Sequence, residues 1–136
     1  MSRIINTDSA GKNRRQLTRA VVLALRELMR QTDTSATTCD LAAFIVLALE
    51  QIADSIDPSV LAWEKRGYWL KADRFRLEWA WAGRLGGAMR TALLADDWAG
   101  VARLAAQVAE KLNGIQLPQR HRMGTPWVGA YAKLIN

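Results

Sequence analysis

Apolar residues recur along this chain with the period of α-helices rather than with the alternation of strands. The first predicted helix spans about Asn13 to Gln31, and its apolar positions fall on one face at 100° per residue: Leu17, Val21, Ala24, Leu25 and Leu28. The opposite face carries an arginine stripe of four residues: Arg15, Arg19, Arg26 and Arg30. A solvated outer surface is the simpler interpretation of this stripe, and a binding face for an anionic partner is the alternative.

A second predicted helix, about Thr38 to Ile56, is apolar on all sides between Leu41 and Leu49. Such a helix is buried on most sides, so we expect it to be the central helix of a bundle. Thr37 and Asp40 have the spacing of a capping box at its start. Cys39 is the single cysteine, and we interpret it as a small buried filler rather than as a nucleophile.

A third predicted helix begins at Asp57-Pro58, with Asp57 as its N-cap, and continues to about Leu94. Two apolar stripes run along it at heptad spacing and predict packing on two sides: Leu61, Tyr68, Phe75 with Trp79, and Trp63, Leu70, Leu77 with Trp81. Gly67 is unfavourable within a helix, so the alternative is a helix that starts only after it. Small residues further along predict close approach of another backbone: Ala80, Gly83, Gly87 and Thr91.

The run from Trp63 to Trp81 also holds the strongest binding signal, because cations and aromatic rings alternate in it. One polar strip contains Lys65, Arg66, Asp73, Arg76 and Arg84, with Trp69 in its midst. Trp69 belongs to neither apolar stripe, so its indole is a candidate for stacking on a nucleic-acid base or for a protein interface. The alternative is a tryptophan that the C-terminal tail covers.

A fourth predicted helix, about Asp97 to Asn113, has Asp96 as its N-cap. We expect residues 1–12 to be an N-terminal arm and residues 115–136 to be a tail with a short helix that opens at Thr125-Pro126. The tail carries a basic loop, Arg120, His121 and Arg122, and an apolar edge that should dock on the bundle. The pattern as a whole predicts an all-α, single-domain bundle of about four main helices with the tail packed across it.

The charge of the chain indicates what kind of partner it could bind and says little about its fold. The chain of 136 residues has a formal net charge of +6, and residues 32–57 contain five acids and no base. A basic surplus favours attraction to an anionic macromolecule, either a nucleic acid or an acidic protein. The first 16 residues lack the layout of a signal peptide. The longest uncharged apolar run, Leu41 to Leu49, falls short of a membrane span. We therefore expect a cytoplasmic protein with no membrane partner.

Catalytic chemistry finds little support in the sequence. His121 is the single histidine and lies between two arginines in an expected loop. Glu50 and Asp54 have i, i+4 spacing on the second helix, which is the weak basis for a carboxylate–metal site. No phosphate-binding or dinucleotide motif occurs. We therefore predict a non-enzymatic protein with no cofactor, no metal and no small-molecule substrate.

Three hypotheses about function follow from these patterns. The first is a basic binding module that engages an anionic partner through its two basic helix faces. The second is an assembly subunit, with a homodimer as the simplest case, in which a tryptophan-rich interface binds protein. The third and weakest is a carboxylate–metal enzyme.

Overall fold

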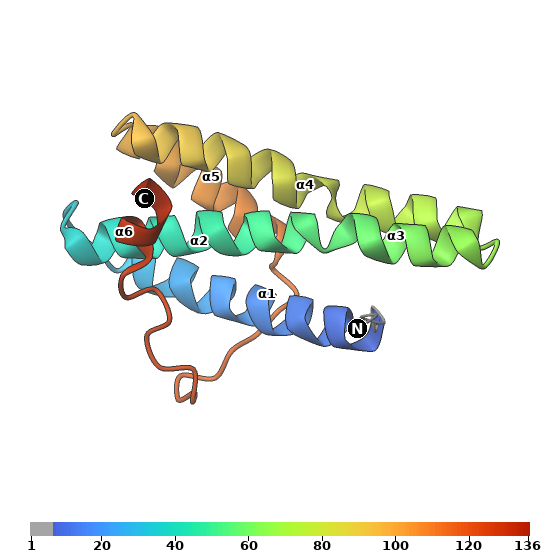
Figure 1. Cartoon of the computed structure of the whole chain (residues 1–136). Helices are drawn as coiled ribbons and strands as arrows, with labels where there is room; N and C mark the ends of the chain where they lie inside the picture. The colour runs from blue at the N-terminus through green and yellow to red at the C-terminus, as the bar shows by residue number, and fades with distance from the viewer. Residues whose placement is uncertain (1–6) are drawn as a thin grey trace.

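The computed structural model describes residues 7–136, and the protein is an all-α, single-domain bundle (Figure 1). The helices are α1 (Thr7–Met29), α2 (Ala36–Asp54), α3 (Ile56–Lys65), α4 (Trp69–Leu94), α5 (Trp98–Lys111) and α6 (Ala130–Ile135). Helix α1 begins at Thr7, so the arm expected over residues 1–12 is wrong for residues 7–12. Residues 1–6 lie outside the described part of the chain.

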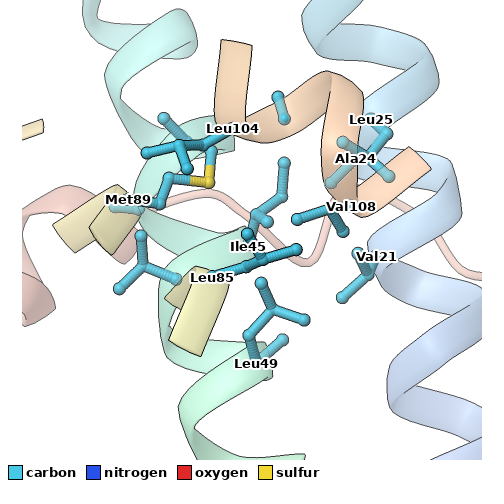
Figure 2. Packing of buried hydrophobic residues seen from close by; sticks show 14 of the residues in the cluster. Val21, Ala24, Leu25, Ile45, Leu49, Leu85, Met89, Leu104 and Val108 are labelled. Carbon is cyan, nitrogen blue, oxygen red and sulfur yellow. The ribbon is translucent and has the colours of Figure 1, made fainter. Parts of the chain in front are cut away.

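Helix α2 is the central element, as its apolar circumference predicts. It contacts α1, α3, α4 and α6, and its apolar residues between Leu41 and Ile52 are mostly buried. Figure 2 shows Ile45 and Leu49 of α2 surrounded by side chains from three other helices: Val21, Ala24 and Leu25 of α1, Leu85 and Met89 of α4, and Leu104 and Val108 of α5. One continuous core therefore forms around α2.

Helices α2 and α3 are almost collinear in Figure 1, with a break at Ser55 between them. The break lies two residues before the predicted position, because α3 begins at Ile56 and Asp57 is already inside it. Pro58 explains the interruption, since it has no N–H to donate to the carbonyl of Asp54 and its ring crowds that turn. Ser55 stabilises the break, and its hydroxyl donates to the carbonyl of Ile52 at 2.6 Å.

The predicted third helix is in fact a helical hairpin of α3 and α4. The chain reverses at Gly67, whose φ of 81° is the left-handed conformation that glycine adopts without strain. The N–H of Gly67 donates to the carbonyl of Glu64 and the N–H of Tyr68 to that of Trp63, both at 3.0 Å. This pair of bonds is the Schellman motif that ends many helices. The alternative of a helix beginning after Gly67 is thus the correct one.

Close packing of α4 on α2 depends on a glycine outside the predicted small-residue groove. Gly86 is buried, and a Cβ on it would lie 3.1 Å from the Cβ of Leu49. A Cβ on Gly83 would meet that of Ala53 at 3.4 Å, whereas one on Gly87 would meet nothing within 4 Å. Ala80, Gly87 and Thr91 are exposed. The prediction of close approach is therefore right for Gly83 and wrong for the other three positions.

The turn from α4 to α5 shifts the predicted N-cap by one residue. Asp97 caps α5, and its carboxylate accepts from the N–H of Gly100 at 3.0 Å. Asp96 instead takes a positive φ of 57° in the turn, and its carboxylate accepts from the indole N–H of Trp98 at 2.7 Å. Aspartate tolerates this conformation better than most residues do. Both acids therefore stabilise the turn, but Asp97 rather than Asp96 is the N-cap.

The tail docks on α2 through Trp127, Ala130 and Leu134, which are buried. Its helix begins at Ala130, later than the Thr125-Pro126 start that we predicted. The capping box at Thr37 and Asp40 is also wrong, because Ser35 flanks α2 and makes no side-chain cap. The carboxylate of Asp40 accepts instead from the N–H groups of Gly129 at 3.1 Å and Tyr131 at 2.9 Å. Asp40 thus anchors the tail.

By length and composition alone, the helical stretch Ala36–Lys65 is long and apolar enough to cross a membrane. We had expected no membrane-spanning segment, because only the uncharged run from Leu41 to Leu49 was considered. The longer apolar stretch, which includes a few charged residues, was overlooked. Half of its most apolar segment is buried inside the protein. The packing of α1, α4 and α6 around α2 accounts for this apolarity, since a core helix has the same composition.

A matched pair of substitutions tests the α2–α4 contact. Gly86→Ala places a methyl group against the backbone-fixed Cβ of Leu49, so we expect it to lower the free energy of unfolding by about 1 to 3 kcal/mol. Gly87→Ala adds the same methyl group in open space and should raise it by up to about 1 kcal/mol, because alanine favours the helix. Urea unfolding measures both. Equal stability of the two variants would contradict the assigned packing.

The anchoring role of Asp40 predicts a local effect on the tail. Asp40→Ala leaves the N–H groups of Gly129 and Tyr131 without their acceptor, and we expect a loss of about 2 kcal/mol in stability. Amide hydrogen exchange should accelerate over residues 129–135 and stay unchanged in α1. Asp54→Ala, at an exposed acid of the same helix, is the matched control and should shift stability by less than about 0.5 kcal/mol. Unchanged exchange in the tail of Asp40→Ala would refute the anchor.

Candidate functional site

Helix α3 and the first part of α4 form a hairpin that extends beyond the rest of the bundle (Figure 1). Its two helices hold together through a small cluster of their own, in which Ile56, Val60 and Ala72 are buried. Trp63, Phe75 and Trp79 pack against this cluster. The rings of Trp63 and Phe75 meet edge to face, with centroids 4.7 Å apart and planes at 79°. This part of the aromatic run therefore serves packing, as predicted.

The remaining apolar residues of the hairpin face outward. Five large side chains are more than half exposed: Leu61 at 56%, Tyr68 at 56%, Trp69 at 62%, Leu70 at 65% and Leu77 at 77%. The prediction that both heptad stripes are packed is therefore wrong for Leu61, Tyr68, Leu70 and Leu77. The reason is the reversal at Gly67. The stripes were predicted for one continuous helix, whereas the chain forms two helices with different directions. Contiguous exposed apolar side chains on a soluble domain commonly mark an interaction surface.

Trp69 is not covered by the tail, which docks on α2 far from the hairpin (Figure 1). The end of the hairpin, which we call the hairpin tip, comprises residues 63–78 and contains an open hollow of about 550 Å³. Trp63, Phe75 and the exposed rings of Tyr68 and Trp69 line this hollow. The ammonium group of Lys71 lies over the Trp63 ring, 4.8 Å from its centroid. Aromatic faces and cations thus share one concave surface.

Charge at the hairpin tip is positive, although part of it is neutralised. Lys65, Arg66, Lys71 and Arg74 are exposed, and no salt bridge within residues 9–136 engages them. Arg76 differs, because its guanidinium pairs with Glu64 at 2.9 Å and with Asp73 at 3.0 Å. The predicted strip is therefore split. Lys65, Arg66 and Trp69 lie together at the tip, whereas Arg76 is occupied by acids.

Arg84 is exposed but lies apart from the tip residues. It follows Trp69 by fifteen residues along α4, which places it roughly 22 Å further along the helix axis. The sequence analysis did not include Lys71 and Arg74 in this surface, because a helical wheel drawn through Gly67 places them on another side of the helix. Glycine followed by the aromatic pair Tyr68-Trp69 is the signal that could have indicated a turn with exposed rings.

Helix α1 supports the hairpin through Arg14, which is buried despite its charge. Its guanidinium lies over the Phe75 ring, 4.7 Å from the centroid. It also donates to the hydroxyl of Ser55 at 3.2 Å and, at 3.5 Å, to that of Ser59. Burial, reinforced by the neighbouring Arg15, lowers the pKa of Arg14, and Glu78 partly offsets this. Arg14 therefore joins α1 to the α2–α3 break and to α4 at once.

The predicted arginine stripe lies on the outer side of α1, but its members differ in their surroundings. Arg15 and Arg19 are exposed. Arg26 is half-buried and donates to the carbonyl of Pro118 at 3.2 Å, and Arg30 pairs with Glu27 at 3.1 Å. Arg26 and Arg30 lie at the end of α1 remote from the hairpin (Figure 1). Arg26 and Arg30 therefore do not belong to the surface at the hairpin tip.

The basic triplet of the tail lies in the loop between α5 and α6, as expected. Arg120 and Arg122 are exposed, and His121 is half-buried. The Nδ1 atom of His121 accepts from the N–H of Met123 at 3.2 Å. This contact gives the imidazole a local structural role in shaping the loop.

The acids that motivated the carboxylate–metal hypothesis are arranged for structure. Both oxygens of Glu50 accept from Arg90, at 2.8 and 3.0 Å, and this bond raises the pKa of Arg90. Within the described residues, no three His, Cys, Asp or Glu side chains are grouped to hold a metal ion. Burial, with Asp40 and Asp96 nearby, raises the pKa of the half-buried Cys39. The thiol is therefore poorly activated.

Comparisons of the chain with protein-family models, with curated proteins and with solved structures gave no match. We therefore infer function from the surfaces of this molecule alone.

The support that Arg14 gives to the hairpin is testable with a neighbouring arginine as control. Arg14→Met keeps most of the side-chain length but removes the cation over Phe75 and the bond to Ser55. We expect a loss of about 1 to 3 kcal/mol in unfolding free energy and faster amide exchange in α3. Arg15→Met removes an exposed charge and should change stability by less than about 0.5 kcal/mol. If both variants behaved alike, Arg14 would have no such role.

Proposed function

We propose that this protein is a non-enzymatic binding module that engages an anionic partner through the hairpin tip. The observation that carries the proposal is Trp69, an indole that is 62% exposed among unpaired cations. An exposed tryptophan is costly to leave in water, so a surface that keeps one is commonly a binding surface.

The cations around the ring favour a nucleic acid as the partner. Lys65, Arg66, Lys71 and Arg74 supply four positive charges without ion-paired acids, and phosphate groups are attracted to such a patch. Tyr68 and Trp69 supply ring faces on which bases stack in a sequence-tolerant way. The open hollow between them is wide enough to admit such a base, with a volume of about 550 Å³. An acidic protein is the other anionic partner that this charge would suit.

A second candidate function is assembly through the same hairpin. Leu61, Leu70 and Leu77 are among its most exposed side chains, and leucine contributes little to nucleic-acid recognition. Burying these leucines against a second copy would favour a homodimer in which two hairpins form one bundle. Catalysis is not part of the proposal, because Arg90 holds both oxygens of Glu50.

The decisive experiment is a fluorescence anisotropy titration of labelled single-stranded DNA, duplex DNA and RNA across a salt series. We expect binding with a steep salt slope, since neutralised phosphates release counterions. Trp69→Ala should weaken binding about tenfold or more, because stacking on one base contributes roughly 1 to 3 kcal/mol. Sedimentation velocity on the same samples, with Leu77→Glu alongside, tests the second candidate.

Two lysines at opposite ends of the molecule provide the matched control for charge. Lys65 lies at the hairpin tip, and Lys133 lies on α6 at the other end of α2 (Figure 1); both are exposed. Lys65→Ala should lower the affinity and the salt slope, whereas Lys133→Ala should leave both nearly unchanged. Binding that appears only at low salt, or that both substitutions weaken equally, would reject a site at the tip. Concentration-dependent dimers abolished by Leu77→Glu would instead support assembly.

A further inference from the structure

A second surface, on the side of the bundle formed by α1 and α5, is apolar and open. These two helices enclose a groove of about 400 Å³ whose walls are Leu25, Leu28 and Met29 on α1 and an alanine row on α5. The alanine row consists of Ala102, Ala105, Ala106 and Ala109. The groove continues into a neighbouring hollow of about 430 Å³ that Ile115 closes. We call this surface the α1–α5 groove.

The groove exists because the facing walls differ in the size of their side chains. Alanine on α5 ends at Cβ, so no side chain from that helix fills the space between the axes. Met29 lies on the other wall and is 81% exposed, more than any other large apolar side chain in the described part of the chain. Large side chains from another molecule would fit beside the alanines and cover Met29. The surface is thus apolar and incompletely packed.

The direction of the groove suits a helix. Leu28 of α1 lies near the start of α5, beside Trp98 and Ala102, whereas Val22 and Leu25 lie near Leu112 at its end, so the two helices run in roughly opposite directions. The groove therefore follows both axes for about two turns, or roughly 10 Å. An amphipathic helix places anchors at i, i+3 or i+4 and i+7 over such a length.

One rim of the groove is basic, and it is the rim that the arginine stripe forms. Arg26 and Arg30 line the hollow at its end. The exposed Arg19 precedes Arg26 by seven residues, which places it on the same side of α1 two turns away. The stripe carries one nearby acid, Glu27, which pairs with Arg30. On the α5 rim, Arg103 and Glu110 offset each other. Net positive charge therefore lies along the α1 rim.

We infer that the α1–α5 groove binds an acidic amphipathic helix of a partner protein. The apolar side chains of the partner helix would cover the alanine row and Met29. The carboxylates of that helix would face Arg19, Arg26 and Arg30. A second copy of this chain is a poorer occupant, because a twofold contact would bring one arginine rim against another. The inference is independent of the hairpin tip, which lies at the far end of α1 (Figure 1).

The test uses a labelled synthetic peptide of 16 residues, with leucine at i, i+3, i+4 and i+7 positions and glutamate on the other face, as about four turns of helix. One control peptide has the same composition in scrambled order, and another has lysine in place of glutamate. We expect the acidic amphipathic peptide to bind at least about tenfold more tightly than either control. Equal binding of the scrambled peptide, or of the lysine peptide, would overturn the inference.

Variants of this protein test whether the peptide binds in the groove. Ala106→Glu adds a bulky acid to the alanine row and should weaken binding about tenfold. Ala88→Glu is the same change at an exposed alanine of α4 and should leave affinity within about twofold, since Ala88 does not line the groove. Circular dichroism establishes that both variants are folded.

Two further outcomes would contradict the inference. Loss of peptide binding in Trp69→Ala, with Ala106→Glu unaffected, would assign the peptide to the hairpin tip. A dimer that Ala106→Glu dissociates would assign the groove to a second copy. Failure of the nucleic-acid titration at the tip leaves the groove untouched, because the two tests vary residues on separate surfaces.

Discussion

The burial of α2 is the constraint on which the rest of the structure depends. A helix that is apolar on every side between Leu41 and Leu49 must be covered on every side. Helices α1, α4 and α6 contact it directly, and α5 reaches the same core through Leu104 and Val108 (Figure 2). The tail also docks on α2, because the carboxylate of Asp40 accepts hydrogen bonds from the backbone of the tail. The bundle is thus arranged around one helix rather than around a symmetric core.

The same constraint explains why the hairpin is exposed. Helix α3 continues almost in line with α2, but it is covered by fewer elements: α4 packs along it, and α1 contacts it only slightly (Figure 1). Trp81 of α4 is buried in the core, whereas Leu77 and Leu70, four and eleven residues before it, are exposed. The hairpin therefore depends on a small cluster of its own and on Arg14. A surface in this position is accessible without disturbing the core.

Sequence reasoning could predict most of the fold because helical period and burial are local properties. The central position of α2, the apolar edge of the tail and the class of the protein all follow from spacing. The errors occur where a tertiary contact competes with a local signal. Asp40 has the spacing of a capping box, yet backbone groups 89 and 91 residues away take both its oxygens. Gly67 is compatible with a weak helix or with a Schellman turn, and only the packing of α3 on α4 decides between them.

The candidate surfaces were predictable only in part, for the same physical reason. Charge can be counted from a sequence, but its pairing cannot. Arg76 and Arg66 are equivalent members of one strip on a wheel, whereas Glu64, twelve residues before Arg76, reaches it across the turn. Exposure is equally non-local: Leu77 and Trp81 belong to the same predicted stripe, and one is exposed while the other is buried. The alanine row of α5 gave no signal, because its role depends on what α1 leaves uncovered.

The pairing of charges decides where unpaired cations remain, although it leaves the net charge of +6 unchanged. Asp40 binds backbone N–H groups of the tail, and Glu50 neutralises Arg90 within the bundle. Neither carboxylate offsets a cation at the hairpin tip or along the α1 rim. Unpaired cations lie near the exposed Trp69, and Arg26 and Arg30 line the hollow beside the exposed Met29. An apolar surface with unpaired cations attracts an anionic partner over a longer range and holds it by burial at contact. Should both proposals hold, the separation of the hairpin tip from the α1–α5 groove would allow two anionic partners to bind at the same time.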